Sequence, residues 1–169
     1  MGFLDKLLGK KAVEPIQIFA PLNGAILERQ EIPDPTFSDE VLGPTLCFKP
    51  EGDDQTIYAP CDGVISQIFK TAHAVTITSK DKVEILIHVG INTVDLKGQG
   101  FEAYVHDDQE VKAGQPLIRF DSKVIADAGL CGYVPFVILN ASDYATCQFV
   151  TPQPITTKDV VCTLTAKEE

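Results

Sequence analysis

The sequence predicts an all-β fold, a sandwich of two similar halves with short helices only. The chain has 169 residues, enough for one domain with a real core, and 44% of them are hydrophobic. From Ile16 onward, short runs of β-branched and other apolar residues alternate with turn residues. The segment APLNGAI at residues 20–26 recurs as APCDGVI at residues 59–65, and Asn-Gly and Asp-Gly are tight-turn dipeptides. A repeat with a hairpin turn in each copy indicates two similar halves in one β-sandwich.

The composition argues against several classes of function. Aspartate and glutamate number 24 against 14 lysines and arginines, so the formal net charge is −10. A surface this acidic repels nucleic acid and favours basic partners, although solubility alone would also explain it. The five cysteines are odd in number and none has C-x-x-C spacing, which argues against a disulfide framework and a zinc knuckle. With no signal peptide and no apolar run near the roughly 18 residues that span a membrane, we expect a cytoplasmic protein.

The first segment, MGFLDKLLGKK at residues 1–11, is amphipathic and basic. On a helix, the apolar residues at positions 3, 4, 7 and 8 share one face, and the lysines cluster elsewhere. Such a segment can lie on an anionic membrane surface, although one this short binds weakly. A disordered tail, or a helix packed on its own domain, is an equally good interpretation.

Residues 30–49 contain three prolines and are therefore expected to form a loop or edge region. Phe37 lies there among three acidic residues. An exposed aromatic ring surrounded by acids would suit a docking surface, whereas a core position is the more common place for such a ring.

Thr71 to Thr78 and Val83 to Val89 read as two strands, joined by the polar turn signal at residues 79–82. Two strands joined in this way form an antiparallel hairpin. If the loop is centred between Lys80 and Asp81, His73 lies directly opposite His88, with Cβ atoms roughly 4.5–5.5 Å apart. A loop of three residues would break this pairing.

The two faces of this hairpin differ. Alternation places the four residues Val83, Ile85, Ile87 and Val89 toward the core, and Glu84, Leu86 and His88 on the outer side. On the partner strand, the Thr71 hydroxyl could reach an imidazole nitrogen of His73 and fix its tautomer. A close pair of histidines suits metal binding, acid–base chemistry or carriage of a phosphoryl group, and it could also be a plain surface pair.

The later chain continues the β pattern. A strand begins at Phe101, and the third histidine, His106, follows in a solvated loop. Residues 111–120 form a turn and a strand, and Asp121 caps a short helix that Gly129 ends. Closing strands are expected at residues 133–139 and 160–165.

The segments TAHA at residues 71–74 and IHVGINTVDLKG at residues 87–98 resemble the two active-site segments of the glucose-type enzyme IIA of the bacterial phosphoenolpyruvate-dependent sugar phosphotransferase system. The likeness extends along almost the whole chain. It implies an amphipathic tail at residues 1–14, partly peripheral at the inner face of the membrane. A single enzyme IIA type 1 domain, a barrel-sandwich hybrid, would follow at residues 15–169. Two positions depart from the family: Lys82 stands where glycine is usual, and Asn92 where aspartate is usual.

The resemblance implies a function for each site residue. His88 would be the phosphohistidine nucleophile, His73 its neighbour, and Thr71 the supporting hydroxyl. The phosphorylated histidine carrier protein would be the donor, and the IIB domain of a glucose-type sugar permease the acceptor. The patch on which both would dock comprises Phe37, Phe69, Leu86 and Val94. The transfer would need no cofactor.

The resemblance also implies a regulatory role. The unphosphorylated protein would bind and inhibit other sugar permeases and kinases such as glycerol kinase, and His73 and His88 would share a zinc ion with a partner's carboxylate. Adenylate cyclase is a further partner that the resemblance implies. Two alternatives remain from the residues themselves. A zinc-dependent hydrolase would need a third protein ligand. A lipoyl-type carrier domain would use Lys82 at the hairpin tip, but such domains are about half this length and leave the histidine pair unexplained.

Overall fold

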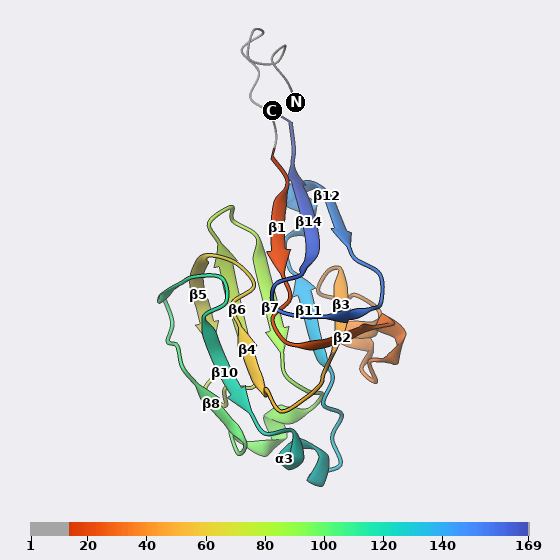
Figure 1. The fold of residues 1–169 in the computed structure, drawn as a ribbon, viewed down its shortest axis with the longest axis vertical. Coiled ribbons are helices and arrows are strands. Elements are labelled where there is room, and N and C mark those ends of the chain that lie inside the picture. Colours follow the sequence, from red (N-terminus) through yellow and green to blue (C-terminus); the bar gives the residue numbers. More distant parts are fainter. Residues whose placement is uncertain (1–13, 169) are drawn as a thin grey trace, which may run out of the picture.

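The computed structural model describes residues 14–168, and its architecture confirms the predicted all-β fold (Figure 1). The described residues form fourteen strands, two short α-helices and three 3-10 helices. The strands are β1 (Ile16–Phe19), β2 (Gly24–Leu27), β3 (Thr45–Pro50), β4 (Thr56–Tyr58), β5 (Gly63–Ile68), β6 (Ala74–Ser79), β7 (Glu84–His88), β8 (Phe101–Ala103), β9 (Glu110–Val111), β10 (Pro116–Phe120), β11 (Val134–Ile138), β12 (Tyr144–Phe149), β13 (Pro154–Ile155) and β14 (Val160–Ala166). The helices are α2 (Pro35–Ser38), α3 (Ser122–Asp127), η1 (Arg29–Glu31), η2 (Thr93–Leu96) and η3 (Ala141–Asp143).

Within this range, no helix has the length and apolar character that a membrane crossing requires. The amphipathic segment predicted for residues 1–11 lies outside the described residues.

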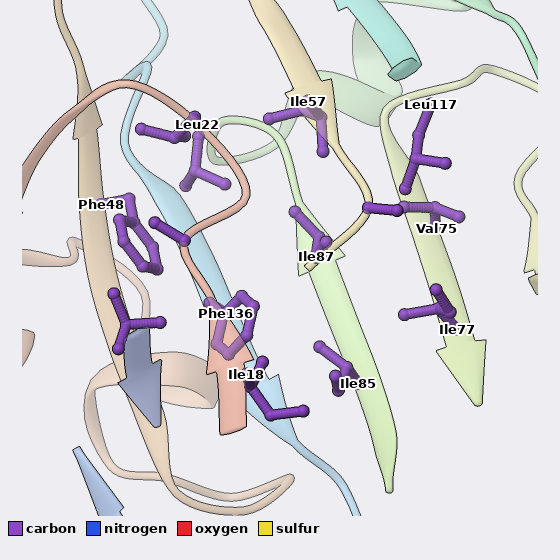
Figure 2. Packing of buried hydrophobic residues seen from close by; sticks show 14 of the residues in the cluster. Ile18, Leu22, Phe48, Ile57, Val75, Ile77, Ile85, Ile87, Leu117 and Phe136 are labelled. Atoms are coloured by element: carbon purple, nitrogen blue, oxygen red, sulfur yellow. The ribbon is translucent and has the colours of Figure 1, made fainter. Parts of the chain in front are cut away.

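Two small sheets pack against one face of a large sheet. The large sheet has the strand order β13-β2-β3-β11-β7-β6-β5-β9, and the small sheets have the orders β1-β14-β12 and β4-β10-β8. One apolar cluster joins the three sheets. Figure 2 shows part of it, where Ile18 of β1, Ile57 of β4 and Leu117 of β10 lie with Ile87 and Phe136 of the large sheet. The opposite face of the large sheet is the side on which His88 lies.

The predicted internal repeat is confirmed, and its two copies contact each other. The Phe19 N–H donates to the Pro60 carbonyl at 2.8 Å, and the Tyr58 N–H donates to the Pro21 carbonyl at 2.7 Å. Phe19 and Tyr58 hold equivalent positions in the repeat, as do Pro21 and Pro60. The large sheet repeats as well, because β13, β2, β3 and β11 correspond to β9, β5, β6 and β7. The two halves are therefore related by an approximate twofold axis.

The Asn-Gly and Asp-Gly dipeptides do not form the predicted hairpin turns. Each copy instead carries the chain from a small sheet into the large one, since β1 and β4 lie in different sheets from β2 and β5. Gly24 and Gly63 are needed for space, because a Cβ would lie 2.1 Å from the Lys49 carbonyl oxygen and 2.2 Å from that of Thr78. The dipeptides alone do not reveal this close approach of a neighbouring strand.

The predicted hairpin forms, but its register is wrong by one residue. Ala74, not His73, pairs with His88, and Thr78 pairs with Glu84. The loop has three residues, 80–82, and Lys82 adopts a left-handed φ of 70°. A non-glycine residue seldom adopts this conformation, which agrees with the glycine that the resemblance implies at this position.

Residues 30–49 are more ordered than predicted. The Asp34 carboxylate caps α2 by accepting a hydrogen bond from the Thr36 N–H at 2.9 Å. β3 lies between β2 and β11, well inside the large sheet. The expectation of a loop or edge is wrong for this strand because all three prolines precede it.

Candidate active site

The two imidazoles lie side by side, as predicted. Their ring centroids are 5.0 Å apart, and the ring planes meet at 82°. His88 is the last residue of β7 and shares the outer face of the large sheet with Leu86, while Ile87 and Val89 point into the main core. The alternation of β7 therefore decides where His88 points.

The backbone of His73 lies beside Val89, whose N–H donates to the His73 carbonyl at 2.7 Å, and a turn directs the His73 side chain toward His88. In a regular strand His73 would point to the same side as Val75, into the core. β6 begins only at Ala74, and Ala72 before it has a left-handed φ of 56°. This turn is closed by the Ala72 N–H, which donates to the Phe69 carbonyl at 2.8 Å. The Phe69 ring then lies 5.4 Å from the imidazole of His73.

A backbone carbonyl fixes the tautomer of His88. Nδ1 of His88 lies 2.7 Å from the carbonyl oxygen of Gly90. A carbonyl oxygen can only accept, so Nδ1 carries the proton in the neutral ring. The lone pair is then on Nε2, so only Nε2 of the neutral ring can act as a base or a nucleophile.

The predicted contact between Thr71 and His73 is present. The Thr71 hydroxyl lies 2.5 Å from Nδ1 of His73. When this hydroxyl donates, the proton of the neutral His73 ring is on Nε2. His73 then offers an N–H donor beside the Nε2 lone pair of His88, and such a donor can bind an anionic oxygen.

Burial keeps both rings neutral. His73 is only 4% exposed, and burial, helped by the neighbouring His88, lowers its pKa from 6.5 to about 4. Burial also lowers the pKa of His88, against the opposing effects of the Gly90 hydrogen bond and the negative charge of Asp34. At neutral pH the Nε2 lone pair of His88 is therefore not blocked by a proton.

The four apolar residues predicted to form a docking patch differ in how exposed they are. The Phe37 ring lies 5.2 Å from the His88 ring and is only 5% exposed. Leu86 is also buried, Phe69 is half-buried, and Val94 in η2 is 50% exposed. Phe37 and Leu86 thus support the site from within, and Val94 presents an apolar surface.

Sequence reasoning did not single out Val41 and Leu42. Both are exposed apolar side chains in the segment that follows α2, the helix whose Phe37 contacts His88. The signal was available, because two adjacent large apolar residues follow the acidic pair Asp39 and Glu40.

Asn92 begins η2 in a backbone conformation that suits asparagine. It adopts a left-handed φ of 60° at the start of η2, and its side chain makes no capping hydrogen bond. Asparagine adopts this conformation more readily than most residues.

The two histidines do not form a complete metal site. In the described part of the chain, no group of three His, Cys, Asp or Glu residues could hold one. His73 and His88 together could supply two nitrogens, which fill half of a tetrahedral zinc site.

Comparisons with known proteins agree with the geometry. Residues 16–144 match the family described as phosphoenolpyruvate-dependent sugar phosphotransferase system, EIIA 1. The glucose-specific EIIA component of Haemophilus influenzae is 39% identical over 146 residues, which are 85% of this chain and 86% of that protein. The mannose-specific EIIBCA component of Corynebacterium glutamicum is 36% identical over 158 residues, which are 94% of this chain and 23% of that protein.

A solved structure leads to the same conclusion. Glucose permease IIA from Mycoplasma capricolum matches with a TM-score of 0.77 and 32% identity, over 89% of this chain and 96% of that one. These matches confirm the resemblance found in the sequence, and they lend no support to a zinc hydrolase or a lipoyl-type domain. The chain belongs to the EIIA 1 family of the phosphoenolpyruvate-dependent sugar phosphotransferase system and is a phosphotransferase component that carries phosphoryl groups.

Proposed function

We propose that this chain serves a glucose-type sugar permease. It accepts a phosphoryl group from the phosphorylated histidine carrier protein onto Nε2 of His88 and passes it to the IIB domain. The observation that carries this assignment is the hydrogen bond from Nδ1 of His88 to the Gly90 carbonyl, which leaves Nε2 as the nucleophile.

In the transfer step, the P–N bond to the donor histidine breaks as a P–N bond to Nε2 forms. The His88 ring gains positive charge, because Nδ1 keeps its proton. The Gly90 carbonyl stabilises that charge, because a hydrogen bond from a charged donor is stronger than one from a neutral donor. The Nε2–H of His73 donates to a phosphoryl oxygen and stabilises negative charge there. Thr71 holds His73 in the orientation that this requires.

The donor and the acceptor dock on the same apolar patch. Val94 contributes exposed apolar surface, and we add Val41 and Leu42 to the patch for the same reason. The formal charge of −10 favours a basic face on each partner. The relative from C. glutamicum bears the combined designation EIIBCA, which supports a IIB domain as the acceptor.

We also propose that residues 15–169 form a single domain after an amphipathic tail at residues 1–14, which contacts the membrane surface. The match over residues 16–144 supports the start of this domain.

When unphosphorylated, the same patch would bind other sugar transporters or kinases. There the two histidines could share a zinc ion with a carboxylate of the partner, since they supply only half of a tetrahedral site. Calorimetry should then detect tight zinc binding only with the partner present; tight binding to this chain alone would contradict it.

The roles of the histidines are tested by phosphorylation with the phosphorylated carrier protein, followed by a chase with the IIB domain. His88→Gln should abolish acid-labile phosphorylation. His73→Gln should accept the phosphoryl group but pass it on slowly, and Thr71→Val should show a milder form of the same defect. His106→Gln, at an exposed histidine, is the matched control and should behave as wild type. Phosphorylation of His88→Gln would refute the assignment of the nucleophile.

The docking patch is tested by Val94→Asp, which places a charge on exposed apolar surface without disturbing the core. Transfer from the carrier protein should slow because docking is weakened, while thermal stability should stay unchanged. Val64→Asp is the matched control, since Val64 is 37% exposed on β5 and lies outside the patch. An equal effect of both substitutions on transfer would count against the patch.

A further inference from the structure

We propose that Thr93 is a positioning residue for phosphoryl transfer. Its buried hydroxyl holds the backbone that aims the Gly90 carbonyl at Nδ1 of His88, and it thereby decides which ring nitrogen is free to react. This inference rests on the proposed function of His88, and it adds a side chain that contacts neither substrate nor ring.

The peptide group between Val89 and Gly90 is held at both of its polar atoms. The Thr93 hydroxyl donates to the Val89 carbonyl at 2.5 Å. The Gly90 N–H of the same peptide group donates to the Tyr133 carbonyl at 3.0 Å. Two hydrogen bonds therefore fix this peptide plane, one with the Thr93 side chain and one with the backbone of Tyr133.

The next peptide group, between Gly90 and Ile91, is held in the same way. The Ile91 N–H donates to the Cys131 carbonyl at 2.9 Å. The Gly90 carbonyl of this group accepts from Nδ1 of His88 at 2.7 Å. Four groups fix these two peptide planes: the carbonyls of Tyr133 and Cys131, the His88 ring and the Thr93 hydroxyl. Apart from His88, Thr93 is the only one that holds them through its side chain. A substitution of Thr93 can therefore remove one of these hydrogen bonds without changing the His88 ring.

The shape of Thr93 matches this role as well. Gly90 has a left-handed φ of 79°, and a Cβ there would lie 2.4 Å from Cγ2 of Thr93. The methyl group of Thr93 thus occupies the position beside Gly90 that a side chain there would need, while its hydroxyl donates to the Val89 carbonyl. Thr93 is fully buried, so water does not replace the hydroxyl when it is removed.

A buried threonine could instead matter only for stability, and the test must separate the two. The readout is the tautomer of His88 in ¹⁵N-labelled full-length protein, observed through the ring nitrogen resonances, together with the rate of phosphorylation. Wild type should show the Nδ1–H form. Thr93→Val keeps the shape without the donor; it should give a mixture of tautomers and slow phosphorylation by about 2- to 10-fold, the range expected for one hydrogen bond.

Three further variants make this result specific. Thr93→Ser keeps the hydroxyl and should restore the Nδ1–H form and most of the rate. Thr93→Ala also lacks the hydroxyl and replaces Thr93→Val if that variant does not fold. Thr45→Val is the matched control, because Thr45 is also buried and its hydroxyl also donates to a backbone carbonyl, that of Gly43 at 2.8 Å. It should leave the His88 tautomer and the rate unchanged.

The proposal is overturned if Thr93→Val or Thr93→Ala loses stability but keeps the wild-type tautomer. It is also overturned if Thr93→Ser behaves as Thr93→Val does. Failure of the proposed function looks different: wild type would then not become phosphorylated on His88, while the tautomer of the free protein would still report on Thr93.

Discussion

The buried, neutral His73 should make the protein less stable in mild acid, and the size of the effect follows from its environment. Folding lowers the pKa of His73 from 6.5 to about 4. Between these values the unfolded chain binds a proton that the folded chain does not. The free energy of unfolding therefore falls as the pH falls through this window, and it is highest above pH 6.5.

The magnitude can be worked out for His73 alone. At pH 5 the unfolded imidazole is mostly protonated and the folded one mostly neutral, which costs about 2 kcal/mol of stability relative to pH 7. Below pH 4 the full shift would cost about 3 kcal/mol. The pKa of His88 is lowered too, so it acts in the same direction.

The assay is guanidinium unfolding followed by circular dichroism at pH 7 and pH 5, for wild type and His73→Gln. Glutamine does not titrate, so the variant should lose about 2 kcal/mol less than wild type between the two pH values. The effects of carboxylates cancel in this comparison. If His73→Gln loses as much stability as wild type, folding does not hold His73 neutral and the reasoning fails.

Two other substitutions follow from the structure. Lys82→Gly should raise the free energy of unfolding by about 1 kcal/mol in denaturant titrations, because Lys82 has a φ of 70° that glycine adopts without strain; no gain would mean that the turn relaxes in solution. Phe37→Ala should cost about 3 kcal/mol of stability and raise the pKa of His88 in NMR titrations, because the Phe37 ring helps to bury that imidazole; an unchanged pKa would show that other groups exclude the water.

The sequence alone determined the class of fold, the direction of the His88 side chain and the internal repeat. These features are local. Alternation along 83–89 separates core from surface because successive side chains of a strand point to opposite faces. The two copies at 20–26 and 59–65 are recognisable as a repeat from their sequences alone. The segments around the two histidines, at residues 71–74 and 87–98, indicated the family from the sequence alone.

Only the tertiary structure decided how the site is assembled. The register of the hairpin depends on the left-handed φ of Lys82, and the place of His73 depends on that of Ala72. Sequence patterns do not show which non-glycine residues adopt a positive φ, because the surrounding contacts must stabilise it. The packing of Phe37 on His88 exists only once β7 and α2 are brought together. The hydrogen bond from the Thr93 hydroxyl to the Val89 carbonyl likewise requires β7 and η2 to meet. The choice of the reactive nitrogen therefore belongs to the folded chain, since it depends on backbone carbonyls whose positions no residue type specifies.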